Sequence, residues 1–352
     1  MPALRILAGT EALRQLREHG LRPELFSHLG AAAGGPKWQV LARLDKALMS
    51  DWLAGRTQPM LAVGASIGAW RLAALAQNDP LAALDRFEEH YLAQAYSEQP
   101  SPHEVSQVAL QIMHGMLGQH GAQEIVDHPW LHLNVLTARA VRGIDGSGSR
   151  GDKLALARAV LANARSRRHL GGWLQRVTFH AGPQAAQFID DGFGNTAVPL
   201  QPQNLSAALL ASGAIPGVLE AVRDIPGAPR GTYLDGGLID YHMDLALAQP
   251  QGLMLLPHFT QRITTGWLDQ FLPWRKAAWL ERTLVLAPTA EFVAGLPGQR
   301  IPSRKDFARF HGRDRERIAA WKSALDAGQQ LADEFVDWIN QPNPIARIEP
   351  LA

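Results

Sequence analysis

Two apolar segments of this chain each run into a glycine-rich turn that is followed by a helical pattern. ELFSHLG leads to Gly34 and Gly35, and MLAV, at residues 60–63, leads to Gly64. Apolar residues recur at helical spacing from about Lys37 onward, and small helix-favouring residues follow the second turn. This alternation predicts a mainly parallel sheet covered by helices on both faces, with reactive loops at the carboxyl ends of the strands.

The composition fits one elaborated folded domain. Of the 352 residues, 46% are hydrophobic and 19% are charged, which is enough apolar material for a sizeable core. The formal net charge of +1 provides no long-range field that would attract phosphate backbones, so we do not expect a nucleic-acid partner. The absence of cysteine excludes disulfides and thiolate nucleophiles and fits a reducing compartment.

The first twenty residues contain no uninterrupted apolar core of signal-peptide length. No charge-free apolar run in the chain is long enough to cross a bilayer. We therefore expect a cytoplasmic location, with peripheral membrane contact as an added alternative.

Further elements can be assigned along the chain. Thr10 is expected to cap a short helix that ends at Gly20, and a charged amphipathic helix is expected after Asp306. Residues 98–103 and 143–152 are expected to be surface loops because they carry prolines or glycines among polar residues. Five more strands are expected at residues 131–141, 174–182, 231–237, 252–259 and 282–288.

Gly64, Ser66 and Gly68 form a GxSxG pattern where a strand passes into a helix. Glycines flank the serine in this motif because the sharp turn crowds its surroundings and lifts the hydroxyl into a cleft. A helix that starts just after the serine directs free N–H groups at developing oxyanion charge. The pattern favours a nucleophilic serine over a turn used only for close packing.

Gly34, Gly35, Pro36 and Lys37 form a second glycine turn at a strand-to-helix junction. Glycines there can bring backbone amides close to a substrate carbonyl oxygen. The phosphate-binding patterns GxxxxGK[ST] and GxGxxG do not fit this turn. We therefore interpret it as an oxyanion loop rather than as a phosphate-binding or purely structural turn.

Asp235 ends the short strand-like segment TYLD and is followed by Gly236 and Gly237. The two glycines leave room around the carboxylate, which suits a buried general base. An aspartate before glycines is also typical of a simple turn.

The order GGPK, GASIG and DGG resembles the patatin-like phospholipase domain, which has GGxR/K, GxSxG and DGG/A. The segment ASGAIPGVLEAV, residues 211–222, resembles the family's Ala-Ser-x-Ala-x-Pro stretch, and the similarity spans roughly residues 25–245. The resemblance implies a three-layer α/β/α sandwich with a mainly parallel central sheet. It also implies an acyl hydrolase domain at residues 1–250 and a C-terminal extension at residues 251–352 packed on the same domain.

The resemblance further implies that Ser66 is the nucleophile and Asp235 the general base of a dyad without histidine. Gly34 and Gly35 would supply oxyanion amides, and Lys37 would hold the loop in shape. The implied activity is hydrolysis of carboxylic esters of lipids, like that of a phospholipase A or lysophospholipase, through an acyl-enzyme and without a cofactor.

Three positions depart from the family pattern. Ala33 replaces the first glycine, Pro36 occupies the variable position, and Trp38 replaces the glycine after the basic residue. Pro36 has no N–H to donate. The oxyanion donors must therefore come from the amides of Gly34, Gly35, Lys37 or Ile67.

Other functions stay open at this point. His258 follows the strand-like GLMLLP and allows an α/β-hydrolase triad in the order Ser, Asp, His, although the glycine loop is GGxK rather than HGGG. A noncatalytic lipid-binding protein and acyl transfer to an acceptor other than water are further alternatives.

We expect no catalytic metal, because Pro129 interrupts the helix that would align His128 and His132 as ligands.

A last stretch, residues 267–279, combines aromatic and basic side chains. Its composition suits a lipid interface, a lid, a wall of an acyl pocket or core packing. The residues concerned are Trp267, Leu268, Phe271, Leu272, Trp274, Arg275, Lys276 and Trp279.

Overall fold

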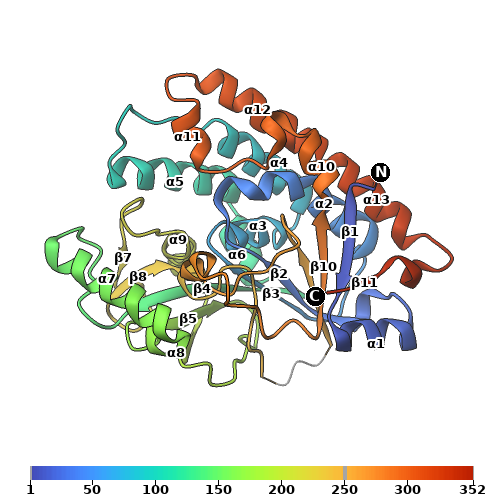
Figure 1. The fold of residues 1–352 in the computed structure, drawn as a ribbon, viewed down its shortest axis with the longest axis horizontal. Helices are drawn as coiled ribbons and strands as arrows, with labels where there is room; N and C mark the ends of the chain where they lie inside the picture. The colour runs from blue at the N-terminus through green and yellow to red at the C-terminus, as the bar shows by residue number, and fades with distance from the viewer. Residues whose placement is uncertain (1, 249–251, 352) are drawn as a thin grey trace.

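A computed structural model describes residues 2–248 and 252–351. A large sheet runs through the middle of the molecule, and helices lie around it (Figure 1). Its strands follow the order β11-β1-β10-β9-β2-β3-β4-β5-β6, and β8 pairs with both β4 and β7. The bounds are β1 (Leu4–Ala8), β2 (Phe26–Ala31), β3 (Met60–Ala65), β4 (Leu131–Ala140), β5 (Leu174–His180), β6 (Asn195–Pro199), β7 (Val222–Arg223), β8 (Thr232–Asp235), β9 (Leu253–Pro257), β10 (Thr283–Pro288) and β11 (Glu349–Pro350).

The centre of the sheet is parallel. The neighbouring pairs β10–β9, β9–β2, β2–β3 and β3–β4 all run in the same direction, whereas β1–β10, β4–β5 and β4–β8 are antiparallel. Side chains alternate between the two faces of the sheet. In β9, Leu253 and Leu255 therefore pack into one hydrophobic cluster, and Met254 and Leu256 pack into the other.

Helices cover the sheet on both sides. The bounds are α1 (Thr10–His19), α2 (Ala42–Ala47), α3 (Ile67–Leu75), α4 (Pro80–Leu92), α5 (Pro102–Leu117), α6 (Gly121–Val126), α7 (Arg150–Arg165), α8 (Arg167–Leu170), α9 (Pro202–Ser212), α10 (Ala290–Gly295), α11 (Lys305–Arg309), α12 (Asp314–Ala327) and α13 (Gln329–Ile339). Shorter turns are η1 (Pro23–Leu25), η2 (Gly35–Leu41), the π-helical η3 (Leu48–Trp52), η4 (Gly236–Leu238), η5 (Trp267–Phe271), η6 (Pro297–Gln299) and η7 (Pro344–Arg347).

The predicted α/β/α fold with a mainly parallel central sheet is confirmed. The prediction that Thr10 caps α1 was wrong, because Gly9 occupies that position and Thr10 is the first helical residue. The expected domain boundary at residues 250 and 251 lies outside the described residues. None of the described helices is both long enough and apolar enough to span a bilayer.

Candidate active site

Ser66 lies in a strained turn between β3 and α3. Its backbone has φ 54° and ψ −133°, a combination that non-glycine residues rarely adopt. Gly68 allows α3 to press against the end of β2, since a Cβ atom there would lie 2.1 Å from the Ala31 carbonyl oxygen. Gly64 is similarly confined, at 2.8 Å from the Ala69 nitrogen. The glycines of GASIG therefore serve the tight strand-to-helix turn that the sequence predicts.

The pairing of β4 brings Ser66 and Asp235 together. Leu136 of β4 pairs with Ala65, the residue before the serine, and the next residue, Thr137, pairs with Asp235 at the end of β8. β8 thus occupies the place beside β4 where β3 has ended. The Ser66 hydroxyl donates a hydrogen bond of 2.7 Å to Asp235 Oδ2, and both residues are buried.

The environment of Asp235 raises the proton affinity of its carboxylate. Burial raises the pKa of Asp235 from its ordinary 3.8 to about 6, against the opposing effects of the Ser66 hydroxyl, the Gly237 N–H and the charge of Arg304. The Gly237 N–H donates to Oδ1 at 2.6 Å, so each carboxylate oxygen is held by a donor. Gly236, also buried, has no room for a side chain because a Cβ atom would lie 2.1 Å from the Leu136 carbonyl oxygen. The carboxylate is oriented toward Ser66 and is suited to accept a proton.

Ser212 fixes the backbone of the turn. The Ser66 N–H donates to Ser212 Oγ at 2.8 Å, and the Ser212 hydroxyl donates to the Leu136 carbonyl oxygen at 2.6 Å. The Ser66 N–H is therefore engaged and is not a free oxyanion donor. The sequence signal for Ser212 is its place in the ASGAIP segment, and that pattern alone does not indicate a role for the hydroxyl.

Gly34 and Gly35 line the same cavity as Ser66 and Asp235. Gly35 adopts φ 56°, which a glycine tolerates, and opens η2. Within the described part of the chain, no acceptor is recorded for the N–H groups of Gly34, Gly35 and Ile67. The cavity lining includes neither Ile67 nor Lys37.

The Lys37 side chain lies over two aromatic rings and does not line the cavity. Its Nζ atom lies 4.6 Å from the centre of the Phe259 ring and 5.9 Å from that of Tyr241. Burial lowers the pKa of Lys37, and the charges of Arg304 and Lys305 lower it further. The loop-supporting role of Lys37 stays a prediction.

The cavity at the Ser66–Asp235 pair is narrow. Its volume of about 20 Å³ accommodates about one water molecule and is far too small for an acyl chain. Trp267 and Arg304 line it from the C-terminal part of the chain, and Arg304 Cγ lies 3.3 Å from where a Cβ atom of Gly35 would be. Sequence reasoning missed Arg304 altogether, because no motif surrounds it. The full lining is Ala33, Gly34, Gly35, Ser66, Ile215, Asp235, Gly237, Leu238, Tyr241, Trp267 and Arg304.

His258 is held apart from this pair of residues. Its Nδ1 atom lies 2.6 Å from the Thr260 carbonyl oxygen, and its ring stacks on Phe259. Burial lowers the pKa of His258 to about 3. Among the described residues, no hydrogen bond joins His258 to Ser66 or Asp235, and His258 does not line their cavity.

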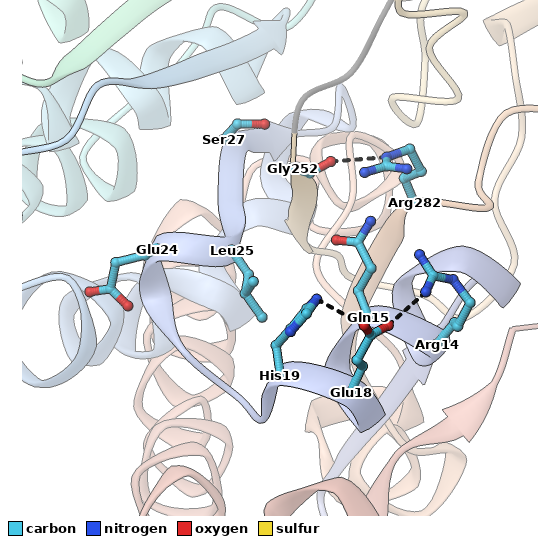
Figure 2. A pocket seen from close by; sticks show the side chains of 9 residues that line it. All are labelled: Arg14, Gln15, Glu18, His19, Glu24, Leu25, Ser27, Gly252 and Arg282. Carbon is cyan, nitrogen blue, oxygen red and sulfur yellow. Dashed lines mark hydrogen bonds and ion pairs between the residues drawn. The ribbon is translucent and has the colours of Figure 1, made fainter.

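A wider cavity of about 420 Å³ lies elsewhere, between α1 and the starts of β2 and β9 (Figure 2). Charged side chains line it, and some of them already pair with one another, as Arg14 does with Glu18 at 2.7 Å. Leu25 and Gly252 place it at the amino ends of these strands, away from the carboxyl ends where reactive loops gather. No group of three or more metal-binding side chains is found in residues 2–248 and 252–351.

Comparison with known proteins points to one family. The family model described as Patatin-like phospholipase matches residues 26–242. The match includes Gly34, Ser66 and Asp235 and ends before Trp267 and Arg304. No curated protein matches the chain.

Proposed function

The chain belongs to the patatin-like phospholipase family, and from that premise we propose that it hydrolyses carboxylic esters of lipids through an acyl-enzyme on Ser66. Family membership supports lipid acyl hydrolase activity in general. The observation that carries the finer proposal is the 2.7 Å hydrogen bond from the Ser66 hydroxyl to Asp235. A serine whose proton is already directed at a carboxylate with a raised pKa is an activated nucleophile.

In the acylation step, Ser66 Oγ attacks the ester carbonyl carbon and its proton passes to Asp235. The carbonyl oxygen becomes an oxyanion that the N–H groups of Gly34 and Gly35 stabilise, with the Ile67 N–H at the start of α3 as a further donor. The tetrahedral intermediate then collapses, and the departing alcohol takes the proton from Asp235. The acyl group is left as an ester on Ser66.

In the deacylation step, water attacks the acyl-enzyme carbonyl and gives its proton to Asp235. Collapse of the second tetrahedral intermediate releases the fatty acid, and Asp235 returns the proton to Ser66. One ester and one water are converted into one alcohol and one carboxylic acid. The same side chains serve both halves of the reaction.

An acyl chain can enter only when the cavity widens. Trp267 and Arg304 come from segments outside the family match and cover the cavity, so their displacement is the simplest route to an open site. Within the described residues, the Arg304 side chain lines the cavity without a hydrogen bond or ion pair that would hold it there.

The test is hydrolysis of p-nitrophenyl esters with chains of graded length by the wild type and three variants. Ser66→Ala should reduce kcat/KM by about 10⁴-fold or more, and Asp235→Asn by about 10²–10⁴-fold. His258→Ala, verified as folded by circular dichroism, should stay active. Comparable loss in folded His258→Ala would favour a triad, and an inactive wild type that still binds fatty acid would favour a lipid-binding protein.

A fluorophosphonate probe tests the nucleophile directly. The wild type should gain one covalent adduct on the peptide that contains Ser66, as measured by mass spectrometry, and Ser66→Ala should gain none. Equal labelling of the variant would refute Ser66 as the nucleophile.

A further inference from the structure

The solvent face of α7 carries an alternating row of arginine and leucine side chains. Successive members of the row are four, four, three and four residues apart. Because an α-helix turns by about 100° per residue, all five side chains lie within an arc of about 80° around the helix. Leu154 and Leu161 are 53% and 69% exposed, and the opposite face of α7 is buried. The row consists of Arg150, Leu154, Arg158, Leu161 and Arg165.

The segment 267–279 exposes aromatic side chains beside α7. Phe271 is 66% and Trp274 is 67% exposed, which is unusual for side chains of this size. Six of the nine large apolar side chains exposed in the described residues lie in α7 or in this segment, so the exposure is concentrated and not scattered. These six are Leu154, Val160, Leu161, Phe271, Trp274 and Trp279. The face formed by the α7 row and segment 267–279 is called the α7 face below.

Buried polar contacts hold segment 267–279 against the buried side of α7, opposite the row. Asn163 of α7 donates to Asp269 at 2.8 Å, and Arg275 Nη2 donates to the Asn163 carbonyl oxygen at 2.9 Å. Asp269 is almost completely buried and also receives the Gly266 N–H at 2.9 Å. The segment that carries the exposed aromatic side chains is therefore hydrogen-bonded to α7.

The α7 face is strongly basic in a chain that is nearly neutral. Residues 150–170 contain six lysine and arginine side chains and one acid, Asp152, whereas the formal charge of the whole chain is +1. Asp152 is buried and accepts backbone N–H groups, so it does not neutralise the surface. Four basic side chains here are exposed and form no ion pair with any of the described residues. They are Arg150, Lys153, Arg158 and Arg165.

An open cavity of about 650 Å³ adjoins the row at Leu161 and Arg165. Its polar lining is basic and includes no acidic side chain, although Arg168 also pairs with Asp190 at 2.9 Å. Apolar side chains form the rest of its lining, so it can hold a phosphate next to the start of a hydrocarbon chain. The lining residues are Arg142, Leu161, Ala162, Arg165, Arg168, His169, Gly172 and Trp173.

The α7 face is connected to the Ser66–Asp235 site. Trp267 lines the narrow cavity, while Phe271, four residues later, is exposed. Arg167 of α8 donates to the carbonyl oxygen of Ile239, close after the DGG segment, and pairs with Asp269 at 3.4 Å. The segment that covers the reactive residues is thus the same segment that carries the aromatic surface.

We propose that the α7 face docks the protein on bilayers that contain anionic phospholipids, with the leucine and aromatic side chains inserted and the arginines paired with lipid phosphates. Apolar insertion together with several basic side chains is the combination that holds peripheral proteins at anionic membranes. Docking depends on these exposed side chains and not on acyl-enzyme chemistry. Docking would also deliver lipid to the Ser66–Asp235 site, and this second step rests on the proposed function.

The test is flotation of the Ser66→Ala protein with vesicles, which separates binding from hydrolysis. Vesicles of phosphatidylcholine with about one third phosphatidylglycerol should carry the protein, and pure phosphatidylcholine should bind it at least about tenfold more weakly. Phe271→Ala/Trp274→Ala and Arg158→Glu/Arg165→Glu should each reduce binding, the charge reversal by about 100-fold or more.

Matched controls lie on helices outside this face. Arg315→Glu/Lys322→Glu on α12, which is distant from α7 in Figure 1, makes the same change in net charge at exposed positions and should leave binding within about threefold. Leu81→Ala on α4 removes an exposed leucine elsewhere and should do the same. Equal loss in the α12 control would show a nonspecific charge effect and would overturn the assignment of the face.

Measurement of hydrolysis with two substrates distinguishes a loss of membrane docking from a loss of function at the Ser66–Asp235 site. With Ser66 intact, the four α7-face substitutions should leave hydrolysis of a soluble short-chain ester unchanged and reduce hydrolysis of phosphatidylglycerol vesicles at least about tenfold. Absence of vesicle binding by the Ser66→Ala protein would overturn the docking proposal even if the ester is hydrolysed. A concentration-dependent dimer that the same substitutions dissociate, without vesicle binding, would assign the face to a protein interface instead.

Discussion

Asp235 shows how one buried carboxyl group links the reactivity of the site to its stability. Its side chain is almost completely buried, and within the described residues its hydrogen-bond donors are the Ser66 hydroxyl and the Gly237 N–H. The effect of burial therefore exceeds that of the hydrogen bonds, and the pKa of Asp235 rises to about 6. The carboxylate is then a stronger base than an exposed aspartate and is still largely ionised at neutral pH.

The dependence of kcat/KM on pH should report this group. Activity requires ionised Asp235, so kcat/KM for a soluble ester should rise with a midpoint near pH 6 and level off above it. Arg304→Gln should move the midpoint upward because the charge of Arg304 lowers the pKa of Asp235. Lys305→Gln, at an exposed neighbouring position, is the matched control and should move the midpoint less. A midpoint near pH 4 in the wild type would contradict the burial argument.

The stability of Asp235→Asn should also depend on pH. The folded protein holds the Asp235 proton more tightly than the unfolded chain does, so stability falls as the pH rises from about 4 to about 6. A change from 3.8 to about 6 corresponds to about 3 kcal/mol. Urea unfolding should show Asp235→Asn more stable than the wild type by up to this amount at pH 8 and by much less at pH 4. Equal differences at the two pH values would contradict the linkage.

At the scale of elements, the segment from η5 to residue 279 depends on one buried acid. Asp269 contacts Asn163, Arg167, the Gly266 N–H and Arg275, and thereby joins α7, α8 and the aromatic segment. Loss of a buried carboxylate leaves its cationic partners without compensation.

Asp269→Ala should therefore lower the free energy of unfolding by about 3–5 kcal/mol. Asp190→Ala removes the exposed partner of Arg168 and should cost less than about 1 kcal/mol. Urea unfolding at pH 7 measures both. A similar small loss for the two variants would show that the Asp269 contacts contribute little.

The elements differ in how far sequence could predict them. Strands β2, β3, β9 and β10 were predictable because each is a short, mainly apolar run with a glycine or proline at its last or next-to-last position. α7 was not, because its buried face carries small or polar residues such as Ala155 and Asn163, and two of its three leucines, Leu154 and Leu161, face solvent. α5 begins at Pro102, inside a segment expected to be a loop, since proline fits the first turn of a helix.

The site was predictable where local motifs mark it. Ser66, Asp235 and the glycines next to them lie in short patterns that match a backbone requirement, and their catalytic roles stay a prediction. Arg304 and Trp267 lie in no such pattern, because their approach to the cavity is set by packing of distant segments. Tertiary placement of this kind has no periodic or spacing signal in one sequence.

At the scale of the whole molecule, the C-terminal part of the chain completes the central sheet. β9 and β10 lie between β2 and β1, so the first strand of the chain reaches the sheet only through strands that come after residue 252. Their side chains contribute to the clusters on both faces.

A chain that ends at residue 248 should therefore fail to fold. Removal of β9 and β10 leaves β1 without its antiparallel partner and leaves one edge of β2 unpaired. Circular dichroism and solubility measure the outcome, and a chain that ends at Asn340, losing only η7 and β11, is the control and should stay folded. A soluble, cooperatively unfolding fragment of residues 1–248 would refute this view.

The register of β4 also determines which parts of the chain can change during evolution without moving the two reactive residues apart. Leu136 and Thr137 set the separation of the nucleophile turn and Asp235, although the two reactive residues are 169 positions apart in the sequence. Insertions in the intervening surface loops, such as residues 143–149, change loop-closure entropy only slightly and leave that register alone. New substrate-contacting loops can thus be added or exchanged there while the distance between the reacting atoms stays constant.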